Sequence, residues 1–202
     1  MTRLIWYLCT ILGGYLLGSI NMGAILARKK GFDIRSKGSG NAGASNALLT
    51  MGKKAAILTA VVDILKAFIP TLLTSHILPV PADVHYLGAI TGTAVILGHI
   101  FPFWMRFKGG KGFASLLGAT LALDWRIVTA MLVILAVIMI TTKYIALATI
   151  LCGILLPIAW YFLGGSIWET AMFGVLAVII FIKHIDNLKR IANHTEISYN
   201  KE

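Results

Sequence analysis

Long apolar stretches separated by short basic loops dominate this sequence. Residues 4–27 contain no charged side chain, and similar stretches lie near residues 55–78, 84–105, 112–123, 127–142, 144–163 and 167–182. Only 13% of the 202 residues are charged and 58% are hydrophobic, whereas soluble domains carry roughly 25% charged residues. Much of the surface must therefore face lipid. We expect an all-α integral membrane protein in which residues 1–202 form a single polytopic membrane domain.

The basic residues predict how the chain is oriented. Seven transmembrane helices with the N terminus outside place most loop Lys and Arg residues on the inner side, together with a cytoplasmic C terminus, and leave Arg3 and Arg126 outside. Residues 112–123 span only about 18 Å as a helix, against a hydrocarbon core of about 30 Å. Removing one span would place the basic C-terminal tail outside, whereas removing two restores its side, so five spans stay an alternative. The first stretch exceeds the core of a signal peptide and ends in Arg28-Lys29-Lys30, which predicts a retained membrane helix.

The net charge of +10 has a different meaning in a membrane protein than in a soluble one. Because the basic residues lie between apolar stretches, they indicate membrane orientation and binding of anionic substrates or membrane lipid. We expect no nucleic-acid partner. The seven-span topology brings three polar segments to the cytoplasmic face: Gly31–Asn46, Lys108–Gly112 and His184–Glu196. We expect these segments to converge on one site.

The first segment combines glycines with hydrogen-bond donors. Glycine permits unusual backbone angles and close approach of a ligand to backbone N–H groups, and a helix that starts near Ser45 would add N-terminal amides. These features favour a phosphate-binding loop over a flexible polar linker. The residues predicted to bind there are Ser39, Gly40, Asn41, Gly43, Ser45 and Asn46.

The second segment is a glycine turn between two lysines. We expect Gly109 and Gly110 to leave their backbone amides uncovered, while Lys108 and Lys111 supply cations to a phosphate. A basic flank at the membrane surface is the alternative, and it suits Lys108 better than Lys111. For His99, two helical turns inside the membrane boundary, packing and function both stay open.

The third segment carries the side chain best suited to proton exchange near neutral pH. His184 and Asn187 are spaced i, i+3 on one helix face, with Arg190 one turn further. A purely interfacial histidine is the alternative. Inside the second apolar stretch, Asp63 and Lys66 have the same spacing, and we expect a structural ion pair because isolated charges are costly in a bilayer.

Taken in order, these motifs resemble the bacterial acyl-phosphate-dependent glycerol-3-phosphate acyltransferases, a family of small seven-helix membrane proteins. The resemblance covers nearly the whole chain. It rests on Gly18-Ser19-Ile20, Asp33-Ile34-Arg35, the run Gly38–Asn46, Asp63 with Lys66, Gly98-His99 with Phe101-Pro102, Lys108–Gly112, and His184, Asn187 and Arg190 with Thr195-Glu196.

The resemblance implies an activity and roles for individual residues. It implies transfer of a fatty acyl group from acyl phosphate to the 1-hydroxyl of glycerol 3-phosphate, giving lysophosphatidic acid at the cytoplasmic face of the bacterial inner membrane. Ser39 and its loop would hold the acyl phosphate, and Lys111, His184 and Asn187 would bind phosphate or orient glycerol 3-phosphate, with Thr149 in the same site. No cofactor and no metal are expected, and the soluble enzyme that produces acyl phosphate is a candidate partner.

Three positions depart from the family pattern. Leu49 replaces an arginine, Ala146 replaces a serine in the sixth predicted helix, and His194 stands where glycine is common. These departures keep two alternatives open: a relative with weak or altered acceptor activity, or a membrane partner of the acyl-phosphate-producing enzyme. A transporter for organic phosphates is a third, although its polar groups would be expected at the midplane.

Overall fold

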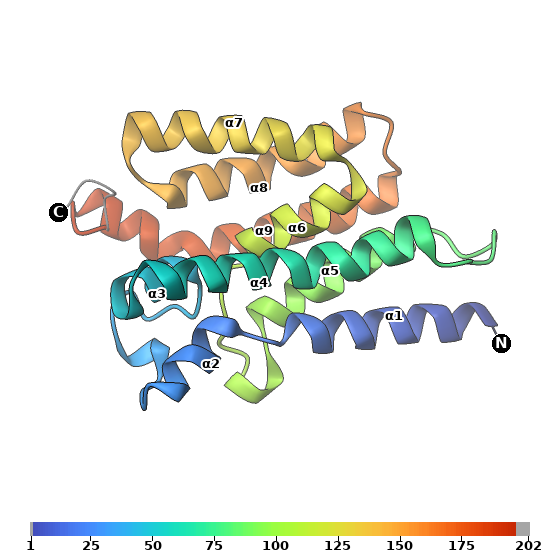
Figure 1. Ribbon diagram of the computed structural model, residues 1–202. Helices are drawn as coiled ribbons and strands as arrows, with labels where there is room; N and C mark the ends of the chain where they lie inside the picture. Colours follow the sequence, from blue (N-terminus) through green and yellow to red (C-terminus); the bar gives the residue numbers. More distant parts are fainter. Residues whose placement is uncertain (1, 197–202) are drawn as a thin grey trace. The chain divides into compact units, whose positions relative to one another are not determined.

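The computed structural model describes residues 2–196, and these residues form helices and connecting turns only (Figure 1). The chain divides into two compact units, unit 1 (Met1–Leu123) and unit 2 (Asp124–Glu202). The all-α prediction is confirmed for the described residues. The predicted cytoplasmic C terminus lies in residues 197–202, outside the described part of the chain.

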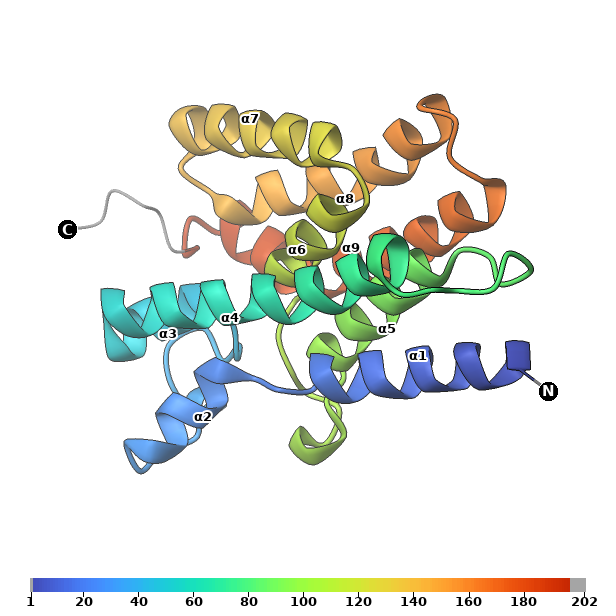
Figure 2. The same cartoon turned by 45° about the vertical axis from the view of Figure 1, so that its right-hand side comes forward.

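Unit 1 contains six α-helices and three short turns of other helix types. The α-helices are α1 (Thr2–Gly18), α2 (Met22–Lys29), α3 (Ala44–Met51), α4 (Lys53–Leu72), α5 (Leu87–Ile100) and α6 (Phe113–Leu123). The short turns are η1 (Ile34–Ser36), η2 (Leu73–Ile77) and η3 (Phe103–Met105). Helix α1 packs along α5, and α4 packs along both α5 and α6, an arrangement visible in two views (Figures 1 and 2).

In its described residues, 124–196, unit 2 contains three long helices, α7 (Trp125–Thr142), α8 (Ile145–Phe162) and α9 (Ile167–Ala192). Helix α8 packs against both α7 and α9. Helix α9 begins with a capping box. The Ser166 hydroxyl accepts a hydrogen bond from the Glu169 backbone amide, and the Glu169 carboxylate accepts one from the Ser166 backbone amide. Leu156, Leu176 and Ile180 are buried between the helices.

Six segments among the described residues are long and apolar enough to cross a membrane. They are Arg3–Lys29, Lys53–Ile77, Leu87–Met105, Trp125–Thr142, Ile145–Phe162 and Ile167–Ala192. Helix α6 has only 11 residues and is a shorter apolar helix, as its sequence suggested. The chain is thus a multi-span helical membrane protein, while the count of seven spans stays a prediction.

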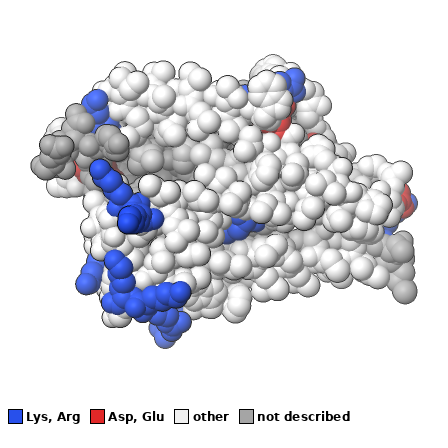
Figure 3. All heavy atoms as spheres, viewed as in Figure 1, with Lys and Arg blue, Asp and Glu red and all other residues white. Residues whose placement is uncertain are grey.

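Positive charge gathers at one end of unit 1, over α2 and α3 (Figure 3). This end carries Arg28, Lys29, Lys30, Lys53 and Lys54 at the termini of α2 and α4. The opposite end carries the Arg3–Asp83 ion pair. The asymmetry agrees with the positive-inside pattern of the sequence, and the orientation itself stays a prediction.

The first apolar stretch forms one candidate span, Arg3–Lys29, but it consists of two helices, which corrects the expectation of one continuous helix. Helix α1 ends at Gly18 and α2 begins at Met22, with the Asn21 side chain accepting a hydrogen bond from the Ala24 amide at 2.9 Å. The interruption frees backbone carbonyls that a membrane cannot hydrate. Side chains bind two of them: the Trp104 indole donates to Ser19 O at 2.7 Å, and the Lys66 ammonium donates to Ile20 O at 2.6 Å. Hydropathy could not reveal the break, because residues 19–21 add no charge.

Candidate functional site

The loop of residues 38–46 is organised by a single side chain, that of Asn46. Asn46 is fully buried, and its Oδ1 accepts a hydrogen bond from the Ser39 amide at 2.8 Å. Its Nδ2 donates to the carbonyls of Ile34 and Asn41 at 2.8 Å and of Lys37 at 3.0 Å. Both amide hydrogens are thus engaged within the loop. Asn46 therefore shapes the loop, and its predicted part in substrate binding stays a prediction.

The remaining predicted binding residues of this loop surround the start of α3. Helix α3 begins at Ala44, one residue from the expected start, and its N-cap Gly43 contributes no side-chain cap. Ser45 is exposed on the first turn, and Ser39 and Asn41 are half-buried. Gly40 adopts a φ of +72°, a region that favours glycine. The loop therefore presents side-chain donors beside uncapped helix amides, an arrangement suited to an anion.

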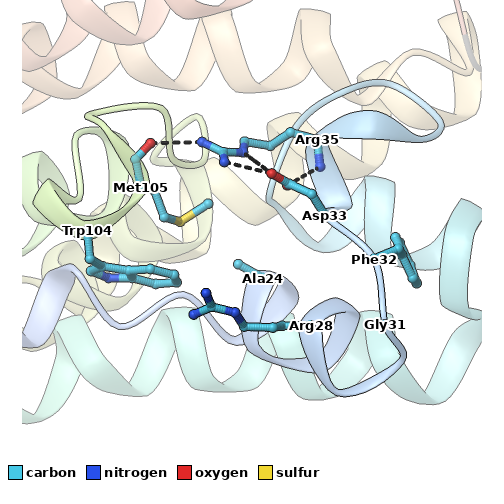
Figure 4. Close-up of a pocket in the computed structure, with 8 residues that line it drawn as sticks. All are labelled: Ala24, Arg28, Gly31, Phe32, Asp33, Arg35, Trp104 and Met105. Carbon is cyan, nitrogen blue, oxygen red and sulfur yellow. Dashed lines mark hydrogen bonds and ion pairs between the residues drawn. The ribbon is translucent and has the colours of Figure 1, made fainter.

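Two contacts fix the base of this loop to the rest of unit 1. On one side, the loop's apolar residues join a buried cluster consisting of Ala24, Ala27, Ile34, Ala42, Ala47 and Met105, with Phe32 and Met51 packed against it. On the other, Arg35 forms an ion pair with Asp33 at 2.7 Å and donates to Met105 O at 2.8 Å (Figure 4). The segments 31–46 and 103–105 are consequently tied together.

A cavity of about 440 Å³ opens beside these contacts. Figure 4 shows its lining residues, which are Ala24, Arg28, Gly31, Phe32, Asp33, Arg35, Trp104 and Met105. Hydrogen bonds from the Arg35 side chain and backbone hold the pKa of Asp33 below its usual value. Asp33 is therefore a carboxylate at neutral pH, and it neutralises the arginine that it binds.

The glycine turn folds back on the end of α5. The Gly109 amide donates to Ile100 O, and the Gly110 amide donates to His99 O, both at 3.0 Å. The expectation that these amides are uncovered is therefore wrong. The reason is that glycine permits close approach within the protein as well as to a ligand: a methyl group on Gly110 would lie 2.0 Å from His99 Nε2. Their role as direct phosphate donors loses its basis, while Lys108 is exposed and Lys111 is half-buried at the entrance to α6.

Asp63 and Lys66 form the predicted ion pair, with Nζ and Oδ1 2.7 Å apart. His99 joins them: its Nδ1 lies 2.9 Å from Lys66 Nζ. All three side chains are almost fully buried. The sequence predicted the pair but left the role of His99 open, because helix spacing cannot show a contact between α4 and α5.

In unit 2 the predicted residues of α9 lie on one buried face. His184 is 4% exposed and Asn187 is 7% exposed. His184 Nδ1 lies 2.8 Å from Ile180 O, and since a carbonyl can only accept, Nδ1 carries a proton and is the donor in this bond. Thr149 on α8 is also buried, with its hydroxyl donating to Ile145 O at 3.0 Å.

Glu196 binds two of the predicted site residues and was not itself predicted as a site residue. Asn187 Nδ2 donates to Glu196 Oε1 at 2.8 Å, and Arg190 Nε donates to Oε2 at 2.7 Å. The Glu196 carboxylate thereby fixes the positions of both side chains. The Thr195-Glu196 pair in the family pattern was the available signal.

The chain reversal that brings Glu196 back to α9 depends on His194. The Thr195 amide donates to Arg190 O at 2.8 Å and the His194 amide donates to Ile191 O at 3.0 Å, the two bonds of a Schellman motif. His194 has a φ of +57°, at the position where such motifs favour glycine. The family's common glycine at this position therefore has a conformational reason.

The fold and these residues define a multi-span helical membrane protein with candidate anion-binding groups in both units. Residues 8–194 match the model of the family described as "Glycerol-3-phosphate acyltransferase", and the chain belongs to this family. It is accordingly an acyltransferase. The predicted convergence of the three polar segments involves both units and stays a prediction.

Known relatives are similar in sequence to this protein along nearly its whole length. The glycerol-3-phosphate acyltransferase of Mesorhizobium japonicum is 40% identical over 184 residues, which cover 91% of each chain. That of Geotalea daltonii is 38% identical over 186 residues, covering 92% of this chain and 94% of the relative.

Two crystal structures of PlsY, an integral membrane glycerol 3-phosphate acyltransferase, have the same fold at 32% identity. The glycerol 3-phosphate form has a TM-score of 0.87 and covers 96% of both chains. The lysophosphatidic acid form has a TM-score of 0.83 and covers 96% of this chain and 95% of the other.

Proposed function

We propose that this protein transfers a fatty acyl group from acyl phosphate to the 1-hydroxyl of glycerol 3-phosphate, releasing lysophosphatidic acid and phosphate. The observation that carries the proposal is the likeness of nearly the whole chain to PlsY in its glycerol 3-phosphate and lysophosphatidic acid forms. An acyl phosphate is a mixed anhydride, so the donor is already activated. The site is proposed to lie at the cytoplasmic face of the bacterial inner membrane.

The reaction is a direct displacement at the acyl carbonyl carbon. The glycerol 3-phosphate oxygen forms the new ester bond, and the bond from the carbonyl carbon to the phosphate oxygen breaks. The hydroxyl proton passes either to the departing phosphate or to His184, whose Nδ1 donates to Ile180 O and whose Nε2 is the nitrogen proposed to receive the proton. Charge on the carbonyl oxygen and phosphate is stabilised by the ammonium of Lys111.

The roles of the other residues follow from their chemistry. Ser39, Gly40, Asn41, Gly43 and Ser45 form the loop that receives the donor phosphate, in the shape that Asn46 fixes. Asn187 and Arg190 act on the acceptor, held by Glu196. Thr149 and Lys108 are the further predicted binding residues, and Lys108 supplies long-range attraction because it is exposed.

A covalent intermediate on Ser39 is the competing mechanism. A serine nucleophile needs an adjacent base. The Ser39 backbone amide donates a hydrogen bond to Asn46 Oδ1, and this bond positions the backbone without activating the hydroxyl. Mass spectrometry of protein quenched during turnover should therefore show unmodified Ser39, and an acylated Ser39 would overturn direct displacement.

The activity test uses protein purified in detergent with acyl phosphate and labelled glycerol 3-phosphate. Lysophosphatidic acid should form with acyl phosphate as donor and should not form with acyl-CoA. Lys111→Ala and His184→Ala should each abolish most of the product, whereas Lys54→Ala, an exposed lysine at the start of α4, should retain it. A protein that makes no lysophosphatidic acid from acyl phosphate would refute the proposed function.

A further inference from the structure

Three buried titratable side chains in unit 1 have no part in the proposed chemistry. Asp63 and Lys66 come from α4 and His99 from α5, and the side chains are 1%, 5% and 3% exposed. Charged groups inside a membrane protein are costly, so they are retained where they are paired and serve the function. The contacts of Asp63, Lys66 and His99 indicate what role the three side chains have.

Their protonation states follow from counting donors and acceptors. The Lys66 ammonium has three N–H groups, and three acceptors surround it: Ile20 O at 2.6 Å, Asp63 Oδ1 at 2.7 Å and His99 Nδ1 at 2.9 Å. His99 Nδ1 must then be an acceptor, which makes the ring neutral with its proton on Nε2. The cluster as a whole carries no net charge, as a buried position requires.

The opposite edge of the His99 ring supports the glycine turn. A methyl group added to Gly110 would lie 2.0 Å from His99 Nε2, 2.6 Å from Cε1 and 3.0 Å from Cδ2. The Gly110 amide also donates to the carbonyl of the same histidine at 3.0 Å. The ring therefore forms the surface on which the turn rests, and the turn leads directly to Lys111.

We propose that Asp63, Lys66 and His99 form a positioning network that places the Gly109–Gly110 turn, and through it Lys111, for binding of a substrate phosphate. The carboxylate of Asp63 orients the ammonium of Lys66, the ammonium orients the ring of His99, and the ring supports Gly110. None of the three side chains touches substrate. The inference rests on the proposed function, since it names the residues that prepare that function's phosphate site.

A steric exchange tests the last link of this network. Gly110→Ala should raise the KM for one of the two phosphorylated substrates about tenfold, because its methyl group displaces the turn from the ring, with a much smaller change in kcat. The three atoms nearest to that methyl group all belong to the His99 ring. Combining Gly110→Ala with His99→Ala should therefore give a KM no higher than that of His99→Ala alone.

Gly109→Ala provides the matched control. Its methyl group would lie 2.2 Å from the backbone oxygen of His99 and 2.5 Å from Pro102 Cδ, and neither atom is removed by His99→Ala. The effects of Gly109→Ala and His99→Ala should therefore add. The proposal would be overturned if His99→Ala removed the KM increase of both glycine variants equally. It would also be overturned if His99→Ala removed the increase of neither.

A conservative variant separates positioning from folding. In His99→Asn, the asparagine Oδ1 can replace Nδ1 as the third acceptor for Lys66, so the protein should fold, but the ring edge beneath Gly110 is lost. Its KM should rise as in Gly110→Ala, and the rise in melting temperature produced by glycerol 3-phosphate or inorganic phosphate should shrink. Variants that melt at lower temperature but keep both KM values and the ligand-induced shift would refute positioning. Failure of the wild-type protein to make lysophosphatidic acid would instead refute the proposed function, while the thermal shift would still test the network.

Discussion

His194 is in a backbone conformation that costs free energy, and replacing it with glycine should stabilise the end of α9. Its φ of +57° lies in the left-handed region, which costs a residue with a Cβ about 1–2 kcal/mol. Glycine avoids that cost but loses about 0.5–1 kcal/mol more conformational entropy on folding. The net gain expected for His194→Gly is about 0.5–1 kcal/mol.

Hydrogen exchange at the Thr195 amide measures this gain directly. That amide donates to Arg190 O across the turn, so it exchanges only when the turn opens. A gain of 0.5–1 kcal/mol corresponds to exchange about two to five times slower in His194→Gly. His194→Ala is the control, because alanine keeps the Cβ and should give no slowing. Equal slowing in the alanine and glycine variants would show that the imidazole, and not the backbone conformation, is responsible.

Three further predictions concern single side chains. Leu49→Arg supplies the arginine that the resemblance implies at this position and should lower the KM for a phosphorylated substrate about three- to tenfold in the lysophosphatidic acid assay. Leu48→Arg, at an exposed neighbour, should not lower it. Glu196→Gln removes the charge that binds Arg190 and should lower the free energy of unfolding by about 1–2 kcal/mol, measured by denaturation in detergent. Asp186→Asn, at an exposed residue, is the neutral control. Equal effects of the two variants would contradict a stabilising role for the Glu196–Arg190 ion pair. Because the Arg35 hydrogen bonds lower the pKa of Asp33, the carboxylate stabilises the fold above its unfolded pKa of about 4 and loses this effect as the pH falls through the lowered value. Asp33→Asn should melt slightly below the wild type at pH 7, and the difference should vanish in strong acid; a difference that persists there would exclude the ion pair as its cause.

The sequence predicted those features that depend on local spacing. The helical class followed from the apolar stretches, and the Asp63–Lys66 pair followed from i, i+3 geometry. The start of α3 at Ala44 was expected to within one residue because glycines and small polar residues precede it. The shared face of His184 and Asn187 also follows from helix periodicity, whereas its burial does not.

The features that were missed depend on contacts between segments far apart in the chain. The break after Gly18 is stabilised by Trp104 and Lys66, which lie 85 and 46 positions from their partners and cannot be connected to them by periodicity. The amides of Gly109 and Gly110 were expected to face a ligand because glycine exposes its backbone, but the turn reverses onto α5. Glu196 meets Asn187 only because the chain reverses at His194.

The single side-chain amide of Asn46 holds the 38–46 loop in one conformation through hydrogen bonds within the protein. It links four points of the loop and its approach, from Ile34 to Asn41. A loop that is already ordered does not lose conformational entropy when an anion binds, so little of the binding free energy is spent on ordering the backbone. Under the proposed function, this order favours binding of the donor phosphate, because the conformational entropy of the loop is lost during folding and not during binding.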